Sequence, residues 1–105
     1  MELANFGLRV SKLRVDKGVS ARDMSLGIGK CANFINKVER GKCRPSMETF
    51  FDICDYLEIS EQEFFDEENL HPQLIRALVS DCMELDGTSQ NHVAGIVREL
   101  IRNRR

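Results

Sequence analysis

Hydrophobic residues recur at intervals of three and four positions along most of the chain, which is the spacing of amphipathic helices. The first stripe consists of Leu3, Phe6, Val10 and Leu13, and Lys17-Gly18 is a typical helix end. Alternation of apolar and polar residues, the pattern of half-buried strands, never persists along the sequence. We therefore expect an all-α fold.

Two short helices are expected next. The second helix begins at Ser20, a residue type preferred at N-caps, and its inner face consists of Ala21, Met24 and Ile28. Two glycines then allow a tight turn before a third helix over residues 31–40, which Gly41 ends. The inner face of this third helix is expected to consist of Cys31, Ile35 and Val38.

A fourth helix is expected after Ser46, with the widest apolar stripe of the sequence, formed by Met47, Phe50, Phe51, Cys54 and Leu57. Residues 60–63, Ser-Glu-Gln-Glu, have the spacing of a capping box and open a short fifth helix that ends at Phe65. These five helices are expected to form one domain over residues 1–68, because a chain of 105 residues has little room for a second core.

A helical hairpin is expected over residues 72–105, broken at Asp86-Gly87, with Pro72 in the first helical position and Ser89 as the second cap. Its first stripe is Leu74, Leu78, Cys82 and Leu85, and its second is Val93, Ile96, Val97, Leu100 and Ile101. These stripes either fold back onto the first domain or pair with a second copy of the chain. We favour dimerisation through the second stripe, because it exceeds what one short helix covers and isologous pairing is the commonest assembly.

The short second helix, the glycine turn and the third helix have the arrangement that presents a helix to the major groove of DNA. Opposite its inner face, the third helix gathers Asn33, Asn36, Lys37 and Arg40. Asparagine can bond adenine in a bidentate manner, and Lys or Arg can reach guanine or phosphate. We expect base contacts from Asn33, Asn36 and Lys37. Phe34 on the flank could touch a thymine methyl group or pack against a neighbouring helix.

Charge is segregated along the chain in a way that its net value of -2 conceals. Residues 1–47 have a net charge of +6, residues 48–70 contain nine acids and no Lys or Arg, and the remainder has a net charge of +1. A basic half can bind a polyanion despite an acidic pI. The expected phosphate contacts are Arg22, Lys30, Arg40, Lys42 and Arg44. The acidic block is either a surface that stays off DNA or a contact for RNA polymerase or a regulatory partner.

From Leu13 to Phe65 the sequence resembles the Xre/phage-repressor family of lambda repressor-like helix-turn-helix regulators. The motifs that carry the resemblance are Ile-Asn-Lys-Val-Glu-Arg-Gly-Lys at 35–42, Arg-Pro-Ser-Met-Glu-Thr-Phe-Phe at 44–51 and Ile-Ser-x-x-Glu-Phe-Phe at 59–65. The resemblance implies five packed helices, with the third in the major groove and a dimer on a two-fold operator. It also implies a structural ion pair between Arg14 and Glu39.

The sequence departs from the family pattern at three positions of the expected DNA-binding segment. Ala21 replaces a Gln that often contacts phosphate, and Cys31 replaces the Ser or Asn that usually starts the recognition helix. Phe34 lies where a polar residue or Tyr is ordinary. These departures alter the expected contacts more than the expected class of ligand.

Other classes of protein find little support. The four cysteines lack C-x-x-C spacing and neither histidine lies near them in sequence, so we expect reduced thiols, no metal and no cofactor. His71 and His92 form no recognisable catalytic arrangement, and no Gly-rich phosphate loop occurs, so an enzyme is not expected. No apolar run reaches the length of a membrane span and no signal peptide is recognisable, so a cytoplasmic protein is expected.

The sequence thus predicts a regulator, in particular a repressor, that binds double-stranded DNA as a homodimer without an evident small-molecule effector. The alternative is a protein-interaction module, such as the antitoxin of a toxin-antitoxin pair. The chain has no disordered neutralising tail of the kind that many antitoxins carry, which weakens that alternative without excluding it.

Overall fold

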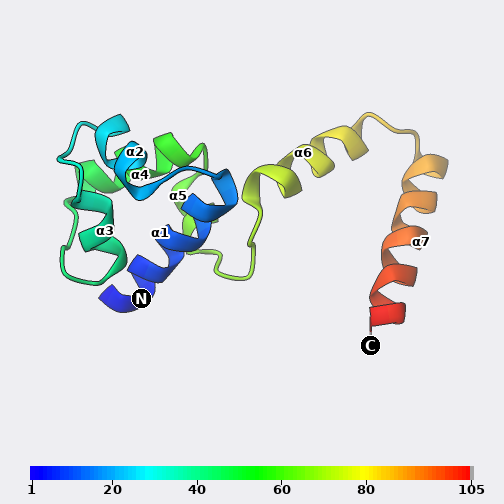
Figure 1. Ribbon diagram of the computed structural model, residues 1–105. Coiled ribbons are helices and arrows are strands. Elements are labelled where there is room, and N and C mark those ends of the chain that lie inside the picture. Colours follow the sequence, from blue (N-terminus) through cyan, green and yellow to red (C-terminus); the bar gives the residue numbers. More distant parts are fainter. Residues whose placement is uncertain (105) are drawn as a thin grey trace. The chain divides into compact units, whose positions relative to one another are not determined.

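The computed structural model describes residues 1–104, and within that range it contains helices and no strands, so the expected all-α fold is confirmed (Figure 1). The elements are α1 Leu3–Lys17, α2 Ala21–Gly27, α3 Phe34–Glu39, α4 Met47–Leu57, α5 Glu61–Phe65, α6 Pro72–Met83 and α7 Gly87–Arg104. Arg105, the last residue of the expected C-terminal hairpin, lies outside the described residues.

The chain divides into two compact units. The first contains Met1–Gln73 and the second begins at Leu74. The start of α6 therefore belongs with the first unit, where Pro72 is buried and the Gln73 side-chain amide donates a hydrogen bond to the Leu57 carbonyl. His71 is also tied to this unit, because its Nδ1 lies 2.5 Å from Asp16 Oδ1 on α1.

The core of the first unit is built by α1 to α5. Its fully buried side chains include Val10, Met24, Ile35, Val38, Ile53, Cys54, Leu57 and Phe64. The expected inner face of α4 is partly wrong, since Met47 is 68% exposed and Phe51 is 45% exposed. Ile53 is fully buried instead, on the side of α4 that contacts α1 and α5.

Serine side chains start three of the helices, as the sequence predicts. Ser20 Oγ accepts from Asp23 N at 3.0 Å and Ser46 Oγ accepts from Thr49 N at 3.1 Å. At α5, Ser60 Oγ accepts from Glu63 N while the Glu63 carboxylate accepts from Ser60 N, which completes the capping box. Each bond satisfies a backbone donor that the first helical turn leaves without a partner.

The third helix begins three residues later than expected, at Phe34 instead of Cys31. Cys31 is exposed and Phe34 N donates to Cys31 O at 3.0 Å, so residues 31–33 form a turn and Cys31 does not contribute to the inner face. The start of α7 was also misplaced. Asp86 Oδ1 accepts from Ser89 N at 2.7 Å, so Asp86 is the cap and Ser89 lies inside the first turn.

Arg9 connects α1 to the end of α5 and the segment beyond it. Its side chain is buried, Nε donates to the Phe64 carbonyl at 2.7 Å, and Nη2 lies 2.8 to 3.0 Å from the carbonyl oxygens of Glu63, Asp66 and Asn69. Desolvation lowers the pKa of Arg9, against the nearby carboxylates of Asp66 and Glu67, which act to raise it. Arg9 therefore belongs to the internal architecture and not to the basic surface.

All four cysteines are free thiols. Burial raises the pKa of Cys54 to about 12, so this side chain acts as a small apolar core residue. Among residues 1–104, no group of three His, Cys, Asp or Glu side chains is placed to hold a metal ion. No helix in the same range combines the length and apolarity required to cross a membrane.

Candidate nucleic-acid interface

Helices α2 and α3 are joined by a tight turn and packed against each other through Ser25. Gly29 takes a positive φ of 77° in this turn, a conformation that glycine adopts at little cost. The buried Ser25 hydroxyl donates to Ala21 O at 2.7 Å and accepts from Ile35 N at 2.9 Å. Asn33, the N-cap residue of α3, makes no side-chain capping bond, so a side chain from α2 satisfies a donor at the start of α3.

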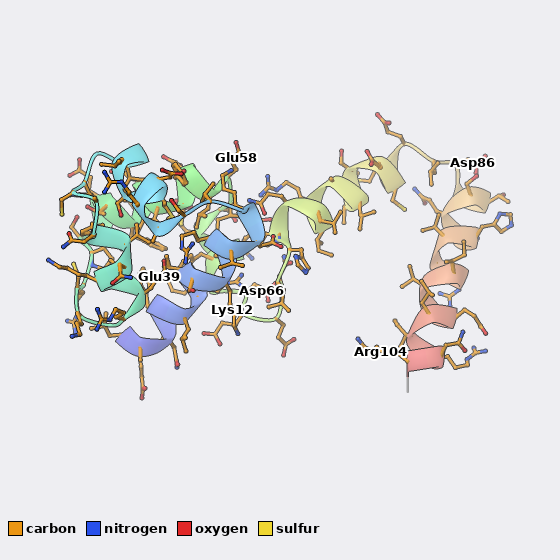
Figure 2. The ribbon with its side chains drawn as sticks, viewed as in Figure 1. Lys12, Glu39, Glu58, Asp66, Asp86 and Arg104 are labelled. Atoms are coloured by element: carbon orange, nitrogen blue, oxygen red, sulfur yellow. The ribbon has the colours of Figure 1, made fainter. Side chains whose placement is uncertain are left out.

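An ion pair attaches α3 to α1. Arg14 Nε lies 2.8 Å from Glu39 Oε2, and Arg14 Nη2 lies 3.0 Å from Glu39 Oε1, in a two-pronged arrangement. The same guanidinium donates to Val19 O at 2.8 Å, and the hydrogen bond to Glu39 raises the pKa of Arg14. Glu39 lies near α1 in Figure 2. Both side chains of the pair are mostly buried. A bidentate pair of this kind fixes orientation as well as distance.

A close backbone contact also joins α1 to the C-terminal end of α3. A Cβ atom on Gly7 of α1 would lie 2.5 Å from Val38 O and 2.6 Å from Glu39 O. Only a glycine permits α1 to approach the C-terminal end of α3 this closely. Together, Gly7, the Arg14–Glu39 pair and Ser25 hold α3 against both of its neighbours.

The outer face of α3 is short and polar. Asn36 and Lys37 are exposed on the helix itself, while Asn33 and Arg40 are exposed at its N-cap and C-cap. Ile35 and Val38 are fully buried on the opposite face. The four polar residues expected to share one helical face are therefore divided between the helix and its two ends.

Phe34 is half-buried and packs against the core, and Lys30 Nζ lies 5.5 Å from the centre of its ring. Of the two alternatives that the sequence left open for Phe34, packing is therefore the one observed in the free chain. A cation at this distance from an aromatic ring is attracted by the ring face. The ring thereby helps to position the Lys30 ammonium group at the edge of α3.

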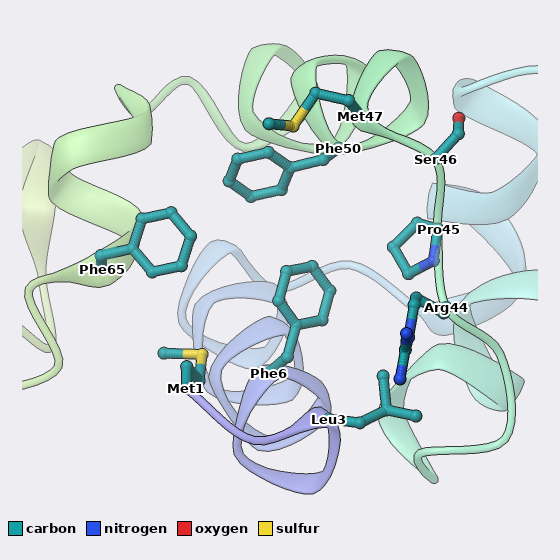
Figure 3. A pocket seen from close by; sticks show the side chains of 9 residues that line it. All are labelled: Met1, Leu3, Phe6, Arg44, Pro45, Ser46, Met47, Phe50 and Phe65. Carbon is teal, nitrogen blue, oxygen red and sulfur yellow. The ribbon is translucent and has the colours of Figure 1, made fainter.

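The remaining candidate phosphate contacts are exposed: Arg22 lies on α2, Arg40 at the end of α3, and Lys42 and Arg44 in the segment before α4. Arg44 also lines an apolar pocket of about 470 Å³. Figure 3 shows its side chain beside Pro45 and Leu3, with the rings of Phe6, Phe50 and Phe65 around the same hollow. Since Arg9 and Arg14 are committed to internal contacts, the basic surface is smaller than the net charge of residues 1–47 indicates.

Three residues that organise the first unit had no signal in the sequence. Gly7 and Arg9 lie within a helical stripe and read as an ordinary helical position and a surface cation. Ser25 reads as an exposed residue of a short helix, although it is fully buried. Their roles depend on partners 10 to 60 residues away, which no local pattern reveals.

A short helix, a tight turn and a second helix with a polar and basic outer face define a helix-turn-helix DNA-binding protein. The chain belongs to the Xre and lambda-repressor type of the helix-turn-helix family, whose match covers residues 10–64 and thus more than half of the sequence. Among curated proteins, no match was found.

A solved structure supports the assignment: the restriction-modification controller protein C.AhdI from Aeromonas hydrophila. The two proteins are 30% identical with a TM-score of 0.57, and the alignment covers 60% of this chain and 91% of C.AhdI. The family and this relative identify the chain as a DNA-binding transcriptional regulator.

Proposed function

We propose that the protein is a repressor that binds its operator as a homodimer, with α3 of each copy in the major groove of one half-site. The observation that carries the proposal is the combination of a polar outer face on α3 with rigid attachment on its inner side. A helix that reads base edges must keep its register, because each base pair presents its donors and acceptors at fixed positions.

Base contacts are assigned to Asn33, Asn36, Lys37 and the accessible edge of Phe34. Asn36 and Lys37 are exposed near the middle of α3, so we assign them the direct readout of base edges. Asn33 lies at the helix start, where its amide can reach the neighbouring base pair. Phe34 keeps its packing against the core and offers only an apolar edge to a thymine methyl group.

Phosphate contacts are assigned to the exposed cations that surround α3, namely Arg22, Lys30, Arg40, Lys42 and Arg44. Such contacts supply affinity and position the protein without reading sequence. Binding of a compact dimer over promoter DNA would exclude RNA polymerase, which is the basis for proposing repression. Charge segregation supports this orientation, since the nine acids of residues 48–70 repel DNA from the remaining surface.

The test is a binding titration of the full chain with its own upstream region and with a random duplex of equal length, repeated over a range of salt concentrations. We expect tighter binding to the upstream region and a linear fall of log K with log salt. Asn36→Ala should weaken specific binding by about tenfold or more and leave binding to the random duplex unchanged. Lys42→Ala should weaken both and lower the salt slope by about one unit per copy.

Equal losses on both duplexes for Asn36→Ala would refute its role in base readout. Absence of binding to either duplex would refute the proposed function and favour a protein-interaction module. A matched control is Asn91→Ala on α7, which removes the same amide from an exposed helix outside the family match and should change neither affinity.

A further inference from the structure

We infer that the apolar faces of α6 and α7 are a docking surface for a second copy of this chain, and that the two copies form an intermolecular four-helix bundle. This inference names the interface of the dimer in the proposed function and rests on that function for its purpose. It rests on the exposure of the apolar residues of α6 and α7 and on the width of their apolar faces.

The second unit leaves its large apolar residues in solvent. Eleven of them are between 39% and 76% exposed: Leu74, Ile75, Leu78, Val79, Met83, Leu85, Val93, Ile96, Val97, Leu100 and Ile101. No residue of α7 is buried, and Pro72 is the only buried residue of α6. Large exposed apolar faces mark sites of interaction, so we assign these two faces to a partner.

The apolar face of α6 is too wide for one neighbour. At 3.6 residues per turn, Leu74, Ile75, Leu78, Val79 and Met83 extend over roughly half of the helix circumference. The seam that contacts a single partner helix is much narrower. A face of this width is covered when the helix contacts two others, which is the situation in a four-helix bundle.

The apolar stripe of α7 is narrower and free of charge. Val93, Ile96, Val97, Leu100 and Ile101 lie on one side of the helix, at spacings of three and four. On the opposite side lie Asn91, Gly95, Arg98 and Arg102, which belong to a solvent-facing surface. Thus one side of α7 is suited to a buried position in the bundle and the other to water.

One chain does not supply both neighbours of α6. Only three residues, 84–86, connect α6 to α7, and α7 is the one other helix in the described part of the second unit. A second copy can supply the other neighbour, and the same contact then covers the α6 face of that copy.

The exposed apolar area of α6 and α7 is large enough for the interface of a stable dimer. A standard interface takes about 800 Å² from each partner, and eleven half-exposed large side chains supply an apolar area of that order. The family match ends at residue 64, so both helices lie beyond the segment that defines the DNA-binding fold. Their conspicuous apolarity is therefore not explained by the helix-turn-helix fold itself.

The test compares the mass of the full chain in solution with that of three variants, by sedimentation equilibrium at micromolar concentrations. The wild type is expected at twice the 12.0 kDa chain mass. Leu100→Glu, at a position that is 65% exposed in the single chain, should raise the dimer dissociation constant by on the order of 100-fold, because two carboxylates would be buried in the bundle. Asn91→Glu places the same side chain on the opposite side of α7 and should leave the dimer intact.

The third variant, Met47→Glu, alters the exposed apolar surface of the first unit and should also leave the dimer intact. A monomeric wild type, an unchanged dimer in Leu100→Glu, or dissociation caused by Met47→Glu would each overturn the inference. Binding of Leu100→Glu to a single half-site, with the affinity of one wild-type copy, shows that the first unit remains folded. A wild-type dimer that binds no DNA would leave the interface standing and refute the proposed function.

Discussion

Replacement of Gly7 by alanine should separate α1 from α3. The new Cβ would lie 2.5 Å from Val38 O, 2.6 Å from Glu39 O and 2.9 Å from Glu39 C, all of them backbone atoms. Ordinary van der Waals contact at a Cβ begins near 3.4 Å, so the two helices must move apart by about 0.9 Å. No side chain can rotate away to absorb the clash.

Two opposing effects set the size of the change. Alanine is favoured over glycine within a helix by about 1 kcal/mol, whereas overpacking in a close-packed interior costs about 1–3 kcal/mol. Displacement of α3 also strains the Arg14–Glu39 pair, whose charged hydrogen bonds are worth about 1.5–3 kcal/mol. We expect a net loss of about 2 kcal/mol, which lowers the Tm of a unit of this size by about 10 °C.

Urea and thermal unfolding followed by circular dichroism measure this loss, and operator binding reports the position of α3. The matched control is Gly95→Ala on α7, where a Cβ would meet no atom within 4 Å and only the gain in helix propensity of up to about 1 kcal/mol remains. If Gly7→Ala is as stable as the wild type and binds the operator equally well, the close approach of α1 to α3 is not a constraint on the fold.

Three further perturbations test single contacts: the hydrogen bond between α2 and α3, the hydrogen bonds of Arg9 and the cap of α7. Ser25→Ala removes the acceptor for the buried Ile35 N–H and should lower the free energy of unfolding by about 1–3 kcal/mol, as measured in urea. A Ser25→Thr variant as stable as the wild type would agree with the hydroxyl group being responsible. Arg9→Leu leaves four carbonyl oxygens without their donor and should lower the free energy of unfolding by about 2–3 kcal/mol. Arg9→Lys should recover little of this loss, because its single ammonium group cannot reach all four oxygens. Full recovery by lysine would contradict the role given to the four hydrogen bonds. The hydrogen bond from Ser89 N holds the pKa of Asp86 below its ordinary value, so the cap stabilises α7 above the ordinary carboxyl pKa and is lost as the pH falls through the lowered one. Helicity followed by circular dichroism should therefore drop at acid pH by less in Asp86→Asn than in the wild type, and identical acid transitions would show that Asp86 does not cap α7.

Local features were predictable from the sequence alone. The caps at Ser20, Ser46 and Ser60 each act on a backbone donor three residues away, so a short stretch of sequence contains both partners. The misplaced cap of α7 shows the limit of this reasoning, because Asp86 and Ser89 are both acceptable cap residues three positions apart. The choice between them depends on which backbone conformation the preceding turn adopts.

The sequence predicted the third helix and its buried face, but it placed the start of the helix three residues too early. Its inner residues Ile35 and Val38 are buried as expected, because an apolar spacing of three follows from the helical repeat. Its start was expected at Cys31 from the same periodicity, but the buried Ser25 hydroxyl satisfies the backbone donor of Ile35 and lets the helix begin at Phe34. A bond between helices ten residues apart cannot be read from the periodicity of one of them.

The amino-acid sequence by itself determined the helical fold class, the order of the helices, the caps of α2, α4 and α5, and the membership of a DNA-binding family. These depend on the spacing of residue types within a turn or two of helix. Only the tertiary structure decided that Arg9 and Arg14 are structural, that Ile53 replaces Met47 and Phe51 in the core, and that Gly7 and Ser25 position α3. The physical reason is that burial and hydrogen-bond pairing depend on which distant segments meet. The packing of whole helices determines which segments those are.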